Sequence, residues 1–180
     1  MSVTDREGFF AAAMRLLAHE GRAGLRLAPL CRAVGVTSGS FYHHFGSWDA
    51  FVDALLAHWE STETHRLVAI AAREPEPQDR LDVLKHLALT FPHEAEAAIR
   101  AWAHGDARVA GVQRRVDAER RRVVAAALGP VEPDPARRDR LAALALAVLV
   151  GQQQRLAPVD VGELLGLFDE LLERVRPAGT

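Results

Sequence analysis

The chain has 180 residues, of which 49% are hydrophobic and 26% are charged, and its formal net charge is −2. This composition is that of a globular protein and excludes a disordered one. No apolar run reaches the roughly 18 residues of a membrane span, and the single cysteine, Cys31, excludes an intramolecular disulfide. Because the N-terminus also lacks the pattern of a signal peptide, we expect a cytoplasmic protein with no membrane partner.

The first quarter of the chain predicts three short helices. Apolar residues recur at helical spacing and strand signals are nearly absent, which predicts an all-α fold of about nine helices. The first helix should end at Gly21. Two further helices are expected over 27–34 and 38–45, with Gly35 in the tight turn between them and Thr37 as the N-cap of the second.

A long helix should follow these three, from Trp48 to about Arg73, where the Pro75 region breaks it. Helix caps and breakers divide the remainder of the chain into five more helices. These are expected to begin near Asp79, His93, Asp106, Asp134 and Asp160. The predicted domains are therefore residues 1–46, continuing into a connecting helix at 47–73, and residues 74–180.

Three short helices with a tight turn between the last two form a helix-turn-helix, which presents one helix to the major groove of DNA. Residues 1–48 carry five arginines against three acids, a local charge of +2. The face left over after the apolar residues pack contains no acid and is rich in hydroxyl, phenol and imidazole groups, which can bond phosphate oxygens or base edges. It consists of Thr37, Ser38, Gly39, Ser40, Tyr42, His43 and His44.

Residues 4–56 resemble the DNA-binding domain of TetR-type transcription regulators. The stretch 35–45 reads GVTSGSFYHHF and matches that family's pattern Gly-Val-Ser/Thr-x-Gly-x-Leu/Phe-Tyr-x-His-Phe. Ser47, Trp48 and Asp49 then stand where the family has Ser-Lys-Glu. The resemblance implies groove contacts from Thr37, Ser38, Ser40, Tyr42 and His43, and DNA-backbone contacts from Tyr42 and His44.

Two positions depart from the family pattern. Trp48 replaces a lysine that normally touches phosphate, and tryptophan offers one N–H donor but no charge. Arg26 replaces a threonine N-cap, and its guanidinium could itself reach phosphate. We expect weaker DNA binding and a shallower salt dependence than in a lysine-bearing relative.

The resemblance further implies a repressor that binds a double-stranded DNA operator as a homodimer, with residues 74–180 as a helical ligand-binding and dimerisation domain. Helix-turn-helix operators usually need paired half-sites, so a dimer is expected. The last two expected helices carry apolar stripes that would form a four-helix bundle between two subunits, although both stripes could instead face the protomer core. The dimer candidates are Leu141, Leu144, Val148, Gly151, Leu164, Phe168 and Leu171.

A small-molecule ligand of unknown identity would relieve operator binding. Aromatic side chains with a few polar groups suit a small-molecule pocket, but core packing explains the aromatics equally well. The candidates are Trp59, His65, His86, Phe91, Trp102 and His104. In the arginine-rich run of residues 114–122, Arg121 could also point inward to an acidic ligand, whereas a solvated helix face is the commoner outcome.

Other function classes have little support in the sequence. No Gly-rich phosphate loop, nucleophile elbow or paired carboxylates in an apolar context indicate catalysis, so we expect no catalytic residue and no cofactor. The eight histidines do not show metal-ligand spacing. The remaining alternative is an architectural or degenerate helix-turn-helix protein without a ligand, against which the length of the second domain argues.

Overall fold

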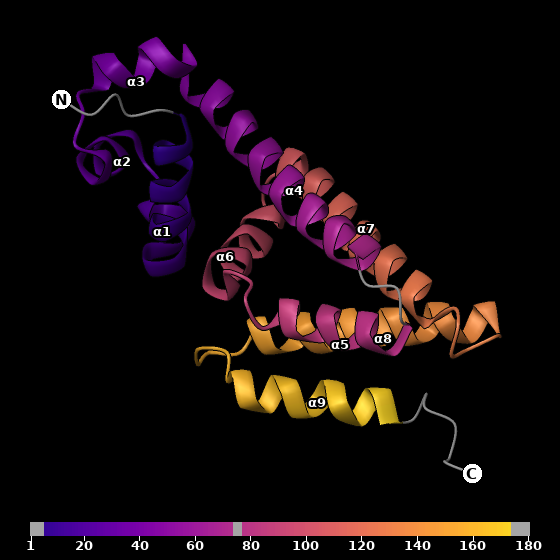
Figure 1. Ribbon diagram of the computed structural model, residues 1–180. Coiled ribbons are helices and arrows are strands. Elements are labelled where there is room, and N and C mark those ends of the chain that lie inside the picture. The colour runs from indigo at the N-terminus through magenta and orange to yellow at the C-terminus, as the bar shows by residue number, and fades with distance from the viewer. Residues whose placement is uncertain (1–5, 74–76, 174–180) are drawn as a thin grey trace. The chain divides into compact units, whose positions relative to one another are not determined.

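The computed structural model describes the backbone of residues 6–73 and 77–173, and the side chains of residues 6–63 and 79–173 (Figure 1). These residues form nine α-helices and no strand, which confirms the predicted all-α fold. None of the described helices is both long and apolar enough to cross a membrane. The helices are α1 (Arg6–Gly24), α2 (Leu27–Val34), α3 (Ser38–Phe45), α4 (Trp48–Arg73), α5 (Pro77–Ala88), α6 (His93–Ala103), α7 (Ala107–Leu128), α8 (Pro135–Gln153) and α9 (Val161–Glu173).

The chain divides into two compact units that differ from the predicted domains. The head unit comprises residues 1–61 and 92–113, and the cavity unit comprises residues 62–91 and 114–180. The head unit thus includes α6 and the start of α7, because α6 packs extensively along α1. Sequence patterns placed the boundary near residue 74, since they mark breaks along the chain but not which distant helices pack together.

Turn geometry in the head unit follows from its glycines. Gly35 has a φ of 78° and its N–H donates to the carbonyl of Cys31 at 2.9 Å, which closes α2 and turns the chain toward α3. At Gly21, where a helix end was predicted, φ is 63°, and α1 continues across this kink to Gly24. A side chain at either position would be strained, because L-residues rarely adopt positive φ.

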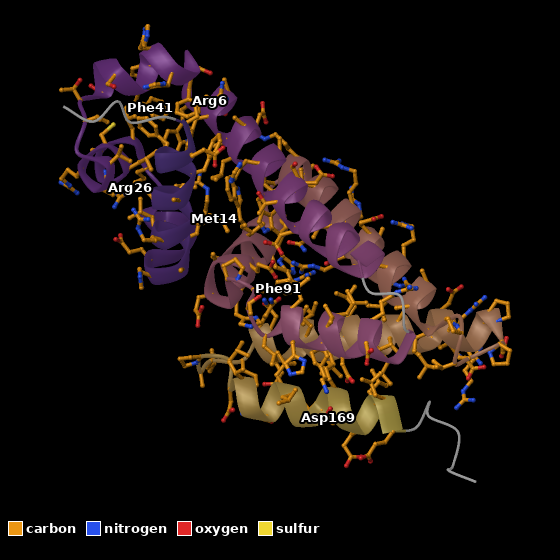
Figure 2. All side chains as sticks on the ribbon, in the orientation of Figure 1. Arg6, Met14, Arg26, Phe41, Phe91 and Asp169 are labelled. Atoms are coloured by element: carbon orange, nitrogen blue, oxygen red, sulfur yellow. The ribbon has the colours of Figure 1, made fainter. Side chains whose placement is uncertain are left out.

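Phenylalanine rings form the core of the head unit. Phe41 of α3 is fully buried, with its ring centroid 5.8 Å from that of Phe9 in α1 and 5.3 Å from that of Phe51 in α4 (Figure 2). Phe45 lies one turn further along α3, with its centroid 5.3 Å from Phe9 and 5.0 Å from Phe51. Edge-to-face contacts of this kind stabilise the core beyond simple burial, so α3 is anchored firmly along one side.

The cavity unit has a separate and mainly aliphatic core, built by α5, α7, α8 and α9. Helices α8 and α9 run side by side within it (Figure 1). Leu164 and Phe168, expected at a dimer interface, belong to this core, where they are 0% and 7% exposed. The apolar stripe of α9 therefore faces the protomer interior at these two positions, which is the alternative that the sequence pattern left open.

Candidate functional site

The outer face of α3 carries the polar side chains that the sequence singled out. Phe41 and Phe45 turn into the aromatic core, and this fixes which residues face outward. Thr37 caps the helix, with its Oγ1 accepting a hydrogen bond from the Ser40 N–H at 3.3 Å. Tyr42 is 46% exposed, a large fraction for an aromatic side chain. The other predicted positions are also accessible: Thr37, Ser38 and His43 are exposed, and Ser40 and His44 are half-buried.

Trp48 and Arg26, the two departures from the family pattern, lie in different environments. Trp48 is half-buried at the start of α4, with its ring centroid 5.8 Å from Phe41 and 5.2 Å from Phe51. Its ring thus packs onto the aromatic core instead of standing free as a lysine would. Arg26 is exposed at the N-cap of α2 and its side chain makes no capping hydrogen bond.

Acidic side chains begin again at the first turns of α4, immediately beyond Trp48. Arg108, at the start of α7, donates to Asp53 at 3.0 Å and lies 3.7 Å from both Asp49 and Asp106. One guanidinium therefore offsets part of the negative charge that would otherwise repel a phosphate backbone near α4. Sequence analysis did not single out Arg108, because no local pattern links residues 55 positions apart.

A cavity that is partly open to solvent lies within the cavity unit. Its walls come from α5, α7, α8 and α9 and from Phe91, which follows α5. The lining residues are Leu81, Leu84, Lys85, Ala88, Phe91, Arg120, Val124, Leu128, Leu141, Ala142, Ala145, Leu146, Leu149, Phe168, Leu171 and Leu172. The mostly apolar wall is typical of small-molecule sites.

Both cations in the cavity wall are paired with carboxylates. Arg120 is 4% exposed, donates to the Glu63 carboxylate at 3.2 Å and places its guanidinium 4.3 Å from the centre of the Phe91 ring. The Lys85 Nζ lies 2.6 Å from Asp169 and 3.2 Å from Asp82. The hydrogen bond to Asp169 is the main cause that raises the pKa of Lys85, so its ammonium stays charged at neutral pH.

Of the predicted ligand residues, Phe91 lines this cavity and the others that the structure describes do not. Trp59 and Trp102 are buried in the head unit, and the Arg22 guanidinium stacks 4.5 Å from the Trp102 ring. His86 and His104 are exposed, and the Nδ1 of each lies within hydrogen-bond distance of the carbonyl one turn earlier in its helix. The side chain of His65 lies outside the described residues. In the arginine run, Arg120 points inward, whereas Arg121 is exposed.

The predicted dimer residues separate into two groups. On α8, Leu144 is 50% exposed, Gly151 is exposed, and Leu141 and Val148 are half-buried. On α9, by contrast, Leu164 and Phe168 are buried inside the protomer and Leu171 lines the cavity. Leu141 of α8 also lines the cavity. We therefore keep Leu144, Val148 and Gly151 as interface candidates and assign Leu141 and the three α9 residues to the interior of the cavity unit.

Part of the head unit matches a known protein family. The model of the family described as bacterial regulatory proteins, tetR family, matches residues 9–55. The match spans most of α1, all of α2 and α3, and the beginning of α4, which together carry the polar face of α3. Residues 9–55 are thus similar to the part that this family model describes.

A curated relative matches part of this chain. The nucleoid occlusion factor SlmA of Marinobacter nauticus is 33% identical over 86 residues, which cover 48% of this chain and 44% of SlmA. The match thus spans less than half the length of that relative.

Solved structures resemble nearly the whole chain in fold. A TetR transcription regulator from Haloarcula marismortui superposes with a TM-score of 0.78 at 16% identity, covering 94% of this chain and 96% of that one. A transcriptional regulator from Saccharomonospora viridis, solved in complex with choline, has a TM-score of 0.76 at 16% identity, with coverage of 93% and 95%. At these identities the likeness shows a shared fold, which includes the cavity unit as well as the head.

Proposed function

We propose that this protein is a homodimeric transcriptional repressor that binds a DNA operator through α3 and is released by a small molecule in the cavity unit. The observation that carries the proposal is the outer face of α3. It presents hydroxyl, phenol and imidazole groups without an acid, while Phe41 and Phe45 hold the opposite side of the helix in an aromatic core. Such a face can bond both base edges and phosphates in a major groove.

The contacts to DNA would be shared between the groove and the backbone. Thr37, Ser38, Ser40, Tyr42 and His43 are proposed to enter the major groove, because these polar side chains are exposed or half-buried along α3 and at its N-cap. Backbone contacts are assigned to Tyr42, His44, Arg26 and the indole N–H of Trp48. With Trp48 packed on the core and no lysine beside it, affinity should depend less steeply on salt than in a relative with lysine there.

Dimerisation is proposed through the exposed face of α8. Leu144, Ala147 and Gly151 are exposed at helical spacing, and Val148 is half-buried beside them. A Cβ added to Gly151 would meet no atom within 4 Å, so a partner helix could approach closely there. An apolar face with small residues suits a self-complementary helical interface, and a twofold dimer would match paired half-sites.

Ligand control is proposed as a population shift. Helix α4 begins in the head unit and continues into the cavity unit, so a change of conformation around the cavity can be passed to the head along one helix. The S. viridis neighbour, solved with choline, supports the view that this fold can hold a small molecule. Ligand would favour dimers whose heads no longer fit two half-sites.

The proposal is tested by binding of the purified protein to the DNA upstream of its own gene, titrated with salt. Tyr42→Ala should abolish saturable, sequence-dependent binding, because it removes the exposed phenol of α3. His19→Ala, at an exposed position of α1, is the matched control and should bind like the wild type. Weak, sequence-blind binding by the wild type, or unchanged binding by Tyr42→Ala, would refute the proposed role of α3.

A further inference from the structure

The cavity wall is almost entirely hydrocarbon, and its two charged groups are already neutralised. All lining side chains except Lys85 and Arg120 are aliphatic or phenylalanine. Transfer of an unpaired charge into such surroundings is strongly unfavourable. The state of these two cations therefore decides which ligands the cavity accepts.

Arg120 is paired inside the protein. Its partner Glu63 is 3% exposed and does not line the cavity, so the ion pair is buried behind the wall. The guanidinium also stacks on the ring of Phe91 at 4.3 Å. An anionic ligand would have to compete with a carboxylate that is already desolvated and in place, which costs more than it gains.

Lys85 is also ion-paired, but its partners are more exposed to solvent than Glu63 is. Its two carboxylate partners, Asp82 and Asp169, lie outside the lining and are 39% and 49% exposed. Each cation of the wall thus has at least one carboxylate partner that lies outside the lining. A cationic ligand would find no carboxylate in the wall itself, and Arg120 already occupies a face of Phe91 that could otherwise hold a cation.

We propose that the cavity binds an uncharged, predominantly hydrocarbon molecule and discriminates against both anions and cations of the same shape. This inference rests on the proposed function of the cavity unit as the ligand-binding part. The ligand is selected by the wall, in which the positive charge of each cation is offset by a carboxylate that lies outside the lining.

Three probes of equal chain length test the inference by calorimetry at pH 7.5 without DNA: 1-decanol, decanoate and decyltrimethylammonium. Decanol should bind at least ten-fold more tightly than either ion. Val124→Trp, which fills the cavity from α7, should abolish decanol binding, whereas Ala126→Trp, exposed on the same helix, should not. Equal or tighter binding of an ion, or no binding of decanol, overturns the inference. Dissociation of the dimer by Val124→Trp would indicate a second copy as the occupant and would also overturn it.

Variants that remove a carboxylate test whether the ion pairs cause the preference for an uncharged ligand. Glu63→Gln and Asp169→Asn each remove one compensating carboxylate, so each should raise the affinity for decanoate relative to decanol at least three-fold. If Glu63→Gln does not fold, Asp169→Asn carries the test, because that side chain is half exposed. An unchanged ratio of affinities would overturn the inference. These affinities are measured without DNA, so failure of DNA binding or release would refute the proposed function while leaving them intact.

Discussion

The cores of the head unit and the cavity unit are packed in different ways. The head unit packs a cluster of phenylalanine rings against α3, beside buried aliphatic residues, and leaves one polar helix face outside. The cavity unit builds an aliphatic core around open volume and places ion pairs in and behind its wall. A helix that contacts the bases of DNA must be held in a fixed position, which a tightly packed core provides. A unit that binds a small molecule must instead leave a cavity in its core.

Truncation of a core phenylalanine should distinguish the two units most strongly. Phe41→Ala should lower the free energy of unfolding by about 4 kcal/mol, because the fully buried ring loses packing on all sides. Phe168→Ala should cost no more than about 2 kcal/mol, because this ring already borders open volume. Urea denaturation at one fixed protein concentration measures both changes. Equal losses would contradict the contrast between the cores.

Breaking the buried ion pair of the cavity unit should be nearly as costly. Glu63→Leu removes the carboxylate that neutralises Arg120, and we expect a loss of about 3 kcal/mol in unfolding free energy. The double variant Glu63→Leu/Arg120→Met should recover most of it, because neither charge of this buried pair remains. Glu119→Leu, which removes an exposed pairing with Arg122, should cost under about 1 kcal/mol and serves as the control. A double variant as unstable as the single one would contradict this assignment.

Surface changes on α8 should affect association more than folding. Gly151→Trp fills open space on the protomer, so its fold should persist, while the dissociation constant of the dimer should rise at least about ten-fold, or about 1.4 kcal/mol. Sedimentation velocity over a concentration series measures this change, with Ala126→Trp as the control on α7. A dimer that tolerates Gly151→Trp would move the interface away from α8.

The smallest expected effect concerns the cap of α7 in the head unit. Burial raises the pKa of Asp106, but the backbone N–H groups of Val109 and Arg108 and the Arg108 guanidinium outweigh it and leave the pKa below its ordinary value of 3.8. A carboxyl with a lowered pKa in the folded state stabilises above its unfolded pKa, and this contribution is lost as pH falls through the folded value.

We therefore expect Asp106→Ala to cost about 1 kcal/mol in unfolding free energy at pH 7, the usual contribution of an N-cap. The difference from the wild type should shrink as the pH falls below 3.8. Asp139→Ala, at an exposed position of α8, is the control. A cost that does not change with pH would show that the carboxylate charge has no part in the cap.

The head unit was largely predictable because its signals are local. Gly35 and Thr37 mark a turn and a helix start within a few residues of the groups they bond, and the i, i+4 spacing of Phe41 and Phe45 determines the outer face of α3. The same local logic could not find Arg108, which meets Asp49 and Asp53 only after α7 returns to α4.

The cavity was not predictable from composition. Aromatic residues were expected around it, but Trp59 and Trp102 fill the head unit, and the walls are mostly leucine and alanine from four helices. In an arginine run, a shift of one residue rotates a side chain by about 100°, so sequence alone could not choose Arg120 over Arg121 as the buried member. Periodicity also could not decide whether Phe168 faces a partner or its own core.

The most direct test of the central claim, that occupancy of the cavity controls the head, is the affinity for the upstream DNA with and without saturating decanol. Fluorescence anisotropy should report at least ten-fold weaker DNA binding in decanol for the wild type and for Ala126→Trp. Val124→Trp, with its cavity filled, should no longer respond. Equal DNA affinity with and without bound decanol, or an equal response in Val124→Trp, would contradict the account.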